Sequence, residues 1–138
     1  MKLLSVNGLR NLVASVGQDT FFALVLKTLE SDFLRWGEFI KTPRLASHYP
    51  FGVIELMPCT DKQFYSFKYV NGHPQNTAQG KLCVVALGIL ADVESGYPLL
   101  FSEMTLLTAI RTAAVTALAA QCLARPRSRH LALIGTGA

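Results

Sequence analysis

Residues 81–124, KLCVVALGILADVESGYPLLFSEMTLLTAIRTAAVTALAAQCLA, carry most of the information about the fold. The apolar run within residues 81–93 is typical of a strand covered on both faces. A turn signal over residues 94–98 leads into a second strand, residues 99–102. Residues 103–124 predict a long helix, whose many alanines permit close backbone approach. We expect this helix to lie buried against a sheet.

Upstream of this stretch the pattern favours further strands. Residues 44–49, 53–57 and 63–70 read as extended segments, and the last is rich in Phe and Tyr. Asn71-Gly72 is a turn dipeptide, which predicts a tight turn before the polar loop 73–80. Together with the two strands of residues 81–102, these segments indicate a meander of about five strands.

The N-terminal region predicts two helices. Asn7 is a candidate cap for a short helix that stops at Gly17, and Asp19 is a candidate cap for a longer one. Apolar residues of the longer segment recur at helical spacing, which indicates a helix packed on a core. These residues are Phe22, Val25, Leu29, Phe33 and Trp36. The expected fold class is therefore α/β, as a mixed α+β domain of two helices, a meander and a long helix.

The C-terminal residues 130–138, HLALIGTGA, read as a strand over 130–134 that runs into Gly135-Thr136-Gly137. This has the form of the first half of a G-x-G-x-x-G fingerprint, whose glycines make a tight turn and admit a pyrophosphate. A glycine-rich tail is the alternative. We interpret residues 1–125 as one incomplete domain, and residues 126–138 as a connector and first strand of a truncated Rossmann domain.

Composition limits the class of protein. The 138 residues suit one domain, and 51% are apolar while only 16% are charged, against about 25% in ordinary soluble proteins. These values exclude a disordered chain, a coiled coil and a collagen-like repeat. The net charge of +4 is mild. The shortage of charge predicts that extra surface is covered by another part of the protein or by a partner.

Other classes of site and location find little support. The longest apolar segment, 106–123, carries Arg111, so no membrane span is expected, and residues 1–12 do not form a signal peptide. Three distant cysteines and the histidine spacing give no metal site or disulfide framework, which favours a reducing, cytoplasmic setting. No basic stripe points to a nucleic acid.

Three segments are recognisable together: FKYVNGHPQNT at 67–77, the run 90–120, and HLALIGTGA at 130–138. They resemble the ornithine cyclodeaminase/mu-crystallin family, most of all its bacterial ornithine cyclodeaminase branch. The resemblance extends over nearly the whole chain from about Asp32 onward. It implies a substrate-binding and dimerisation domain followed by a Rossmann domain, so that this chain is the N-terminal part of a homodimeric enzyme.

The resemblance also implies a reaction. L-ornithine is converted into L-proline and ammonia, with NAD as a catalytic redox cofactor. The family's catalytic aspartate is expected beyond residue 138, so no catalytic residue is assigned here, and the isolated chain is expected to be inactive. Two alternatives stay open: another family activity, such as an NAD(P)-dependent amino-acid dehydrogenase or ketimine reductase, or a non-catalytic dimerisation or ligand-binding module.

Substrate-binding residues follow from the resemblance by position. Arg44 and Lys68 match basic residues that hold the substrate carboxylate, and Glu55 matches a glutamate near its amino group. The chemistry fits, because an α-amino acid is oriented when cations fix its carboxylate. Without the resemblance, all three would pass as residues of a solvated strand face.

The cofactor-binding residues are assigned in the same way. Arg111 and Thr112 match residues that reach the dinucleotide from the long helix, and Gly135 and Gly137 match glycines at its pyrophosphate. An arginine within an alanine-rich helix needs an anionic partner, and a diphosphate would serve. Cys83 stands where the family often has a cofactor-contacting threonine; a thiol is a weaker hydrogen-bonding group.

Overall fold

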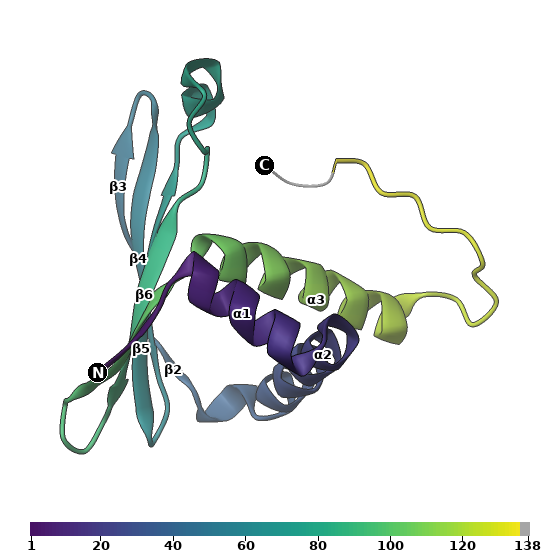
Figure 1. Cartoon of the computed structure of the whole chain (residues 1–138), viewed down its shortest axis with the longest axis horizontal. Coiled ribbons are helices and arrows are strands. Elements are labelled where there is room, and N and C mark those ends of the chain that lie inside the picture. The colour runs from purple at the N-terminus through teal and green to yellow at the C-terminus, as the bar shows by residue number, and fades with distance from the viewer. Residues whose placement is uncertain (136–138) are drawn as a thin grey trace.

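Within residues 1–135, the part of the chain that the computed structural model describes, seven strands form one sheet with three helices on one of its faces (Figure 1). The mixed α/β class expected from the sequence is confirmed. The strands are β1 (Lys2–Leu4), β2 (Ile40–Lys41), β3 (Leu45–Tyr49), β4 (Gly52–Thr60), β5 (Phe64–Gly72), β6 (Ala86–Asp92) and β7 (Pro98–Glu103). The α-helices are α1 (Val6–Val16), α2 (Gln18–Leu34) and α3 (Thr105–Leu123), and short 3-10 helices are η1 (Trp36–Glu38) and η2 (Pro74–Gln79).

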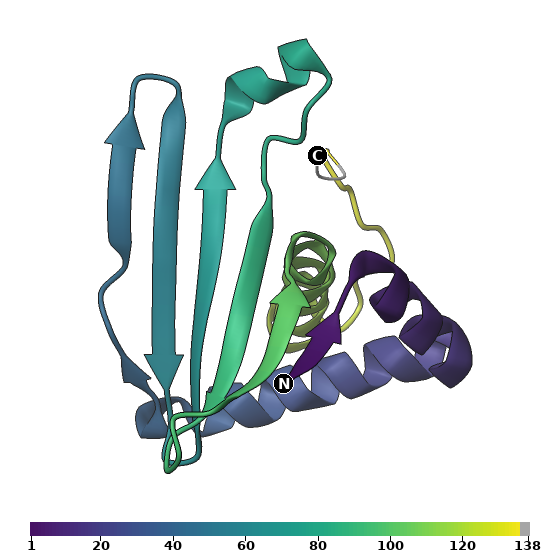
Figure 2. The ribbon, with the colours of Figure 1, turned by 60° about the vertical axis from the view of Figure 1, so that its left-hand side comes forward.

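The predicted five-stranded meander is present as β3 to β7, in which each strand pairs antiparallel with the next (Figure 2). Two short strands extend it. Strand β1 pairs parallel with β7 at one edge, and β2 pairs with β4 at the other. Sequence patterns missed β1 and β2 because two or three residues are too few to show a period of two.

The two faces of the sheet differ in what covers them. In one cross-strand row, Met57, Lys68, Gly88 and Ser102 are successive partners. This row faces the helices, since a Cβ on Gly88 would lie 3.1 Å from the Met104 side chain at the start of α3. The alternating residues point to the opposite face, which no described residue covers. We call it the open face.

The N-terminal helices begin at other residues than expected. Ser5, and not Asn7, caps α1, because its hydroxyl accepts a hydrogen bond from Gly8 N at 3.1 Å. Gly17 precedes α2 with a φ of +89°, a conformation that suits glycine, and the two helices bend by 104° there. Asp19 lies in the first turn of α2 and does not cap it.

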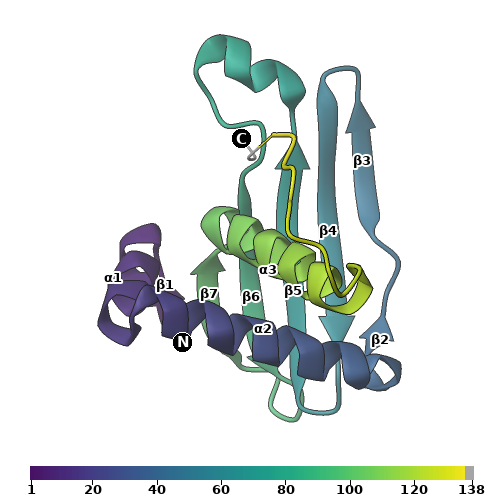
Figure 3. The ribbon, with the colours of Figure 1, turned by 90° about the vertical axis from the view of Figure 1, so that its right-hand side faces the viewer.

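Helix α3 is not buried against the sheet as predicted. It runs beside α2 across one sheet face (Figure 3), and of its residues only Ala114, at 3% exposure, is buried. The remaining sides carry apolar residues with nothing packed on them in the described part of the chain. By length and composition alone α3 could also cross a membrane, even with Arg111 in it. A helix that is apolar on all sides is also typical of the buried core of a larger protein.

Three local expectations are wrong. Asn71 and Gly72 do not form a tight turn but continue β5, where they pair with Ile54 and Val53 of β4. Residues 81–85 are irregular, so β6 begins only at Ala86. Strand β6 is covered by the helices on one face only, and not on both faces as predicted.

The predicted strand over residues 130–134 is also absent. These residues are irregular and exposed, and no strand among residues 1–135 lies alongside them. A strand is stabilised by hydrogen bonds to a neighbour, and without one an apolar run has no reason to stay extended.

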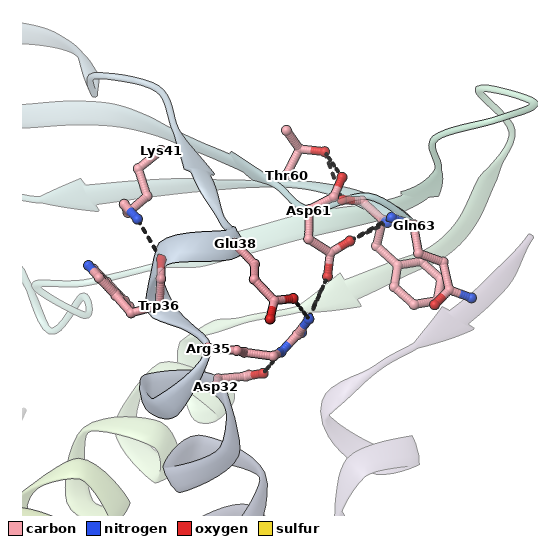
Figure 4. A network of polar contacts seen from close by, with 9 residues as sticks. Asp32, Arg35, Trp36, Glu38, Lys41, Thr60, Asp61 and Gln63 are labelled. Atoms are coloured by element: carbon pink, nitrogen blue, oxygen red, sulfur yellow. Dashed lines mark hydrogen bonds and ion pairs between the residues drawn. The ribbon is translucent and has the colours of Figure 1, made fainter.

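An ionic cluster ties the end of α2 to the turn between β4 and β5 (Figure 4). Arg35 donates from Nε to Asp32 at 3.1 Å and from Nη1 to Asp61 at 3.2 Å. Asp61 also accepts hydrogen bonds from Gln63 N and Phe64 N. The cluster therefore fixes where the chain leaves α2 and enters β2.

Candidate functional site

Four of the predicted site residues gather on the helix-covered face of the sheet. Lys68 lies in the middle of β5, and Glu55 lies on the same face of the adjacent β4. Arg44, just before β3, places its Nη1 3.5 Å from Glu55 Oε1. Arg111 of α3 contributes a further positive charge that Lys68 experiences. Arg44 and Lys68 therefore lie near the Glu55 carboxylate, and Arg111 adds a positive charge near Lys68 from the helix side.

The pKa of Lys68 shows how the charges of these four residues act on one another. Partial burial is the largest cause that lowers the pKa of Lys68 below its ordinary value, and the charges of Arg111 and Arg44 lower it further. Glu55 acts in the opposite direction. One carboxylate thus compensates three cations incompletely, and the site has an excess of positive charge that an anionic ligand would neutralise.

Arg111 and Thr112 point in different directions although they are neighbours. Arg111 lines a cavity of about 340 Å³ between α2, α3 and β4, together with Asp32, Trp36 and Cys59. It makes no ion pair with any residue in the described range 1–135. Successive helical residues are about 100° apart, which explains the separation. Arg111 thus belongs spatially with Lys68, while Thr112 does not.

Thr112 lines a larger cavity, of about 680 Å³, on the other side of α3. Gly135 and Val84 also line it, and Gly135 has a φ of +82°, which glycine adopts without strain. The Thr108 hydroxyl in the same wall is buried without a hydrogen-bond partner. The cavity thus offers a free hydroxyl and small side chains to a polar ligand. Gly137 lies outside the described residues.

Cys83 is set back from this cavity. It is adjacent to Val84, but its Sγ lies 3.8 Å from Pro74 O. Its thiol therefore contacts its own loop. The Cys83 side chain does not line the cavity, whereas its neighbour Val84 does.

Sequence reasoning missed Thr108. It belongs to a series of threonines on α3 that line the larger cavity: Thr105, Thr108, Thr112 and Thr116. Their separations of three and four residues on an otherwise apolar helix are the signal that would have identified this face. No group of His, Cys, Asp and Glu suited to a metal ion occurs among residues 1–135.

The helix-covered face of the sheet carries Arg44, Lys68 and Glu55, with Arg111 on the adjacent helix, and this arrangement can bind an anionic small molecule. The chain belongs to the ornithine cyclodeaminase/mu-crystallin family, whose model matches residues 7–138. The ornithine cyclodeaminase of Agrobacterium tumefaciens (strain Ach5) is 57% identical over 135 residues, which are 98% of this chain and 38% of that protein.

Solved structures of two other enzymes share this fold over nearly the whole chain. The Δ¹-pyrroline-2-carboxylate reductase of Thermococcus litoralis, in complex with NADH and L-proline, superposes with a TM-score of 0.80 at 30% identity, over 94% of this chain and 40% of that one. An archaeal alanine dehydrogenase dimer with bound NAD gives 0.76 at 28% identity, over 93% and 38%. The chain spans about 38% of the length of the curated relative it matches.

Proposed function

We propose that this chain is the N-terminal, amino-acid-binding part of an ornithine cyclodeaminase, an NAD-dependent enzyme that converts L-ornithine into L-proline and ammonia. Its 57% identity to a curated ornithine cyclodeaminase supports this assignment. NAD, when bound, accepts and returns the electrons of the α-carbon. The residues of this chain bind and orient the amino acid.

The observation that carries the proposal is the Arg44–Glu55 ion pair beside Lys68, whose pKa also responds to the charge of Arg111. An amino acid presents a carboxylate and an ammonium group on one carbon. Two cationic side chains can bind the substrate carboxylate, and one protein carboxylate can bind the substrate ammonium group. The α-carbon of the substrate is then held at two points. In this assignment Arg44 and Lys68 hold the substrate carboxylate, and Glu55 lies near its amino group.

Arg111 has two possible anionic partners. The resemblance assigns it to the dinucleotide diphosphate, whereas its charge lies close to Lys68. We place it in the carboxylate group, because Thr112 and not Arg111 lines the cavity with Gly135. Thr112, Gly135, Gly137 and the Cys83 loop remain the proposed cofactor side.

The open face of the sheet supports a homodimer. Leu45, Leu56, Tyr69 and Leu87 form one cross-strand row on it, and Leu3 on β1 is 73% exposed. A continuous apolar sheet face is a typical interface. The archaeal alanine dehydrogenase is a dimer, which agrees with this assembly.

The proposed setting is the cytoplasm. The three cysteines are free, and they are distributed over β4, the loop after η2, and α3. Unpaired thiols are usual in a reducing compartment.

A titration of the isotope-labelled chain tests the proposal. L-ornithine is expected to shift the amide resonances around Lys68 and Glu55, whereas 1,4-diaminobutane, which lacks the carboxylate, is not. Lys68→Met and Arg44→Met should each weaken ornithine binding at least about tenfold, since a charge-assisted hydrogen bond contributes about 1.5–3 kcal/mol. Lys62→Met, in an exposed turn, is the matched control.

Equal shifts by the diamine, or unchanged affinity in both variants, would contradict the carboxylate site. The same titration with L-alanine and L-proline separates the second candidate, an amino-acid dehydrogenase or imine reductase, which the similarity to the Thermococcus litoralis reductase favours. Tighter binding of L-ornithine than of either supports the cyclodeaminase.

A further inference from the structure

The loop between β5 and β6 projects beyond the end of the sheet (Figure 2). This loop, residues 73–85, carries η2 and is called the neck loop here. Two backbone hydrogen bonds close its base: Asn71 N donates to Val85 O at 3.1 Å, and His73 N donates to Cys83 O at 2.9 Å. The side chain of Asn71 makes two further contacts at the same place.

These contacts determine how the Asn71 carboxamide is oriented. The Val85 N–H is only a donor, so the Asn71 atom that faces it must be the oxygen, Oδ1. The amide nitrogen Nδ2 therefore faces His73 Nδ1, at 3.1 Å. Because Nδ2 is only a donor, His73 Nδ1 must accept, and the ring proton of neutral His73 is on Nε2.

The His73 ring is also held by packing. Its centroid lies 5.8 Å from that of Phe51, in the turn between β3 and β4. A Cβ on Gly52 would lie 2.8 Å from His73 Cγ, so the ring is pressed against that turn. His73 thus joins the β3–β4 turn to the neck loop, and Asn71 sets the direction of its nitrogens.

We propose that Asn71 is a positioning residue, which fixes the neck loop and holds His73 in the Nε2–H form. It thereby places residues 83–85 beside the larger cavity, whose wall includes Val84. Only the identity of the ligand in that cavity rests on the proposed function. The role of Asn71 stands on the contacts of this chain alone.

Nitrogen-15 NMR of the whole chain tests the orientation, at about pH 8.5, where an ordinary imidazole is neutral. The native chain is expected to show His73 with Nε2 protonated and Nδ1 bare. Asn71→Asp keeps an acceptor for Val85 N but turns a second acceptor toward Nδ1, so His73 should move its proton to Nδ1. The control is Asn76→Asp: the Asn76 side chain donates to Leu82 O at 3.0 Å within the same loop. Asn76 meets His73 through the backbone, where its N–H donates to His73 O at 3.1 Å, and its side chain has no hydrogen bond with the His73 ring.

Hydrogen exchange tests the positioning. Asn71→Ala removes both side-chain contacts, and exchange of the amides in residues 73–85 should rise at least about tenfold, the combined effect of two lost hydrogen bonds. Amides of the β4–β5 pair should exchange as in the native chain. An unshifted His73 pattern in Asn71→Asp, or native exchange in Asn71→Ala, overturns the proposal.

If Asn71→Ala does not fold, the isosteric Asn71→Asp spectrum decides alone. Neither measurement involves a ligand. Failure of ornithine binding would therefore count against the proposed function and leave this inference intact.

Discussion

Glycine positions show how closely single residues constrain the site. Gly88 lies beside Lys68 in the helix-facing row, and a Cβ there would come within 3.0 Å of Phe67 O. Gly52 is more restricted, because its Cβ would lie 2.3 Å from Gly72 O. Backbone atoms at that distance cannot yield as a flexible side chain can.

Gly52→Ala is therefore expected to destabilise the chain by about 1–3 kcal/mol, the range for overpacked positions. Chemical denaturation measures it. Gly37→Ala is the control, since a Cβ at Gly37 meets nothing within 4 Å. Equal stability of Gly52→Ala and the native chain would mean that Gly72 O and the His73 ring do not press on the β3–β4 turn.

The Arg35 cluster joins α2 to the turn between β4 and β5. The pH dependence of the stability that this cluster contributes follows from the pKa of Asp61. Hydrogen bonds from Phe64 N and Gln63 N, and then Arg35, hold the pKa of Asp61 below its ordinary value. The folded chain therefore releases this proton at lower pH than the unfolded chain. The stabilisation is complete above the unfolded pKa of about 3.9 and is lost as the pH falls through the folded pKa.

We predict that Asp61→Asn lowers the free energy of unfolding at pH 6 and that the difference from the native chain shrinks toward pH 2.5. Denaturant titrations across this range measure it. Glu30→Gln, on the exposed side of α2 and without an ion pair among residues 1–135, should show no such trend. If the difference in free energy of unfolding between Asp61→Asn and the native chain stays constant with pH, the ionisation of Asp61 does not cause it.

At the scale of the whole molecule, two apolar surfaces have nothing packed on them within the described residues: the open face of the sheet and the outer sides of α3. Both agree with the low charge content of the sequence. The surfaces differ in chemistry, since α3 carries threonines toward the larger cavity, whereas the open face carries leucines and aromatic residues. In the proposed function the first surface is the cofactor side and the second is the subunit interface.

Leu87→Gln, in the cross-strand row Leu45–Leu56–Tyr69–Leu87 of the open face, should raise the dissociation constant of the proposed dimer at least about tenfold, because an apolar interface side chain is lost. Light scattering after size exclusion measures it over a concentration series. Leu34→Gln, at the exposed end of α2, is the control at 86% exposure. A native chain that stays monomeric at all concentrations contradicts the interface.

Local patterns in the chain were sufficient for the long helix and the meander, because spacing of apolar residues and turn residues acts over a few positions. The family followed from the resemblance of three segments and not from spacing. The resemblance supplied Arg44, Glu55 and Lys68, and the fold brings them to one face of adjacent strands.

Contacts between distant segments set the rest. Asn71 continues β5 because its side chain meets Val85, fourteen residues away, and a dipeptide rule does not contain that partner. Residues 130–134 form no strand because hydrogen bonds to a neighbour, and not apolar spacing, hold a strand in place. Arg111 lies with Lys68 and Thr112 with Gly135 because α3 packs on α2 at one rotation about its axis. That rotation is a property of packing, which no single segment encodes.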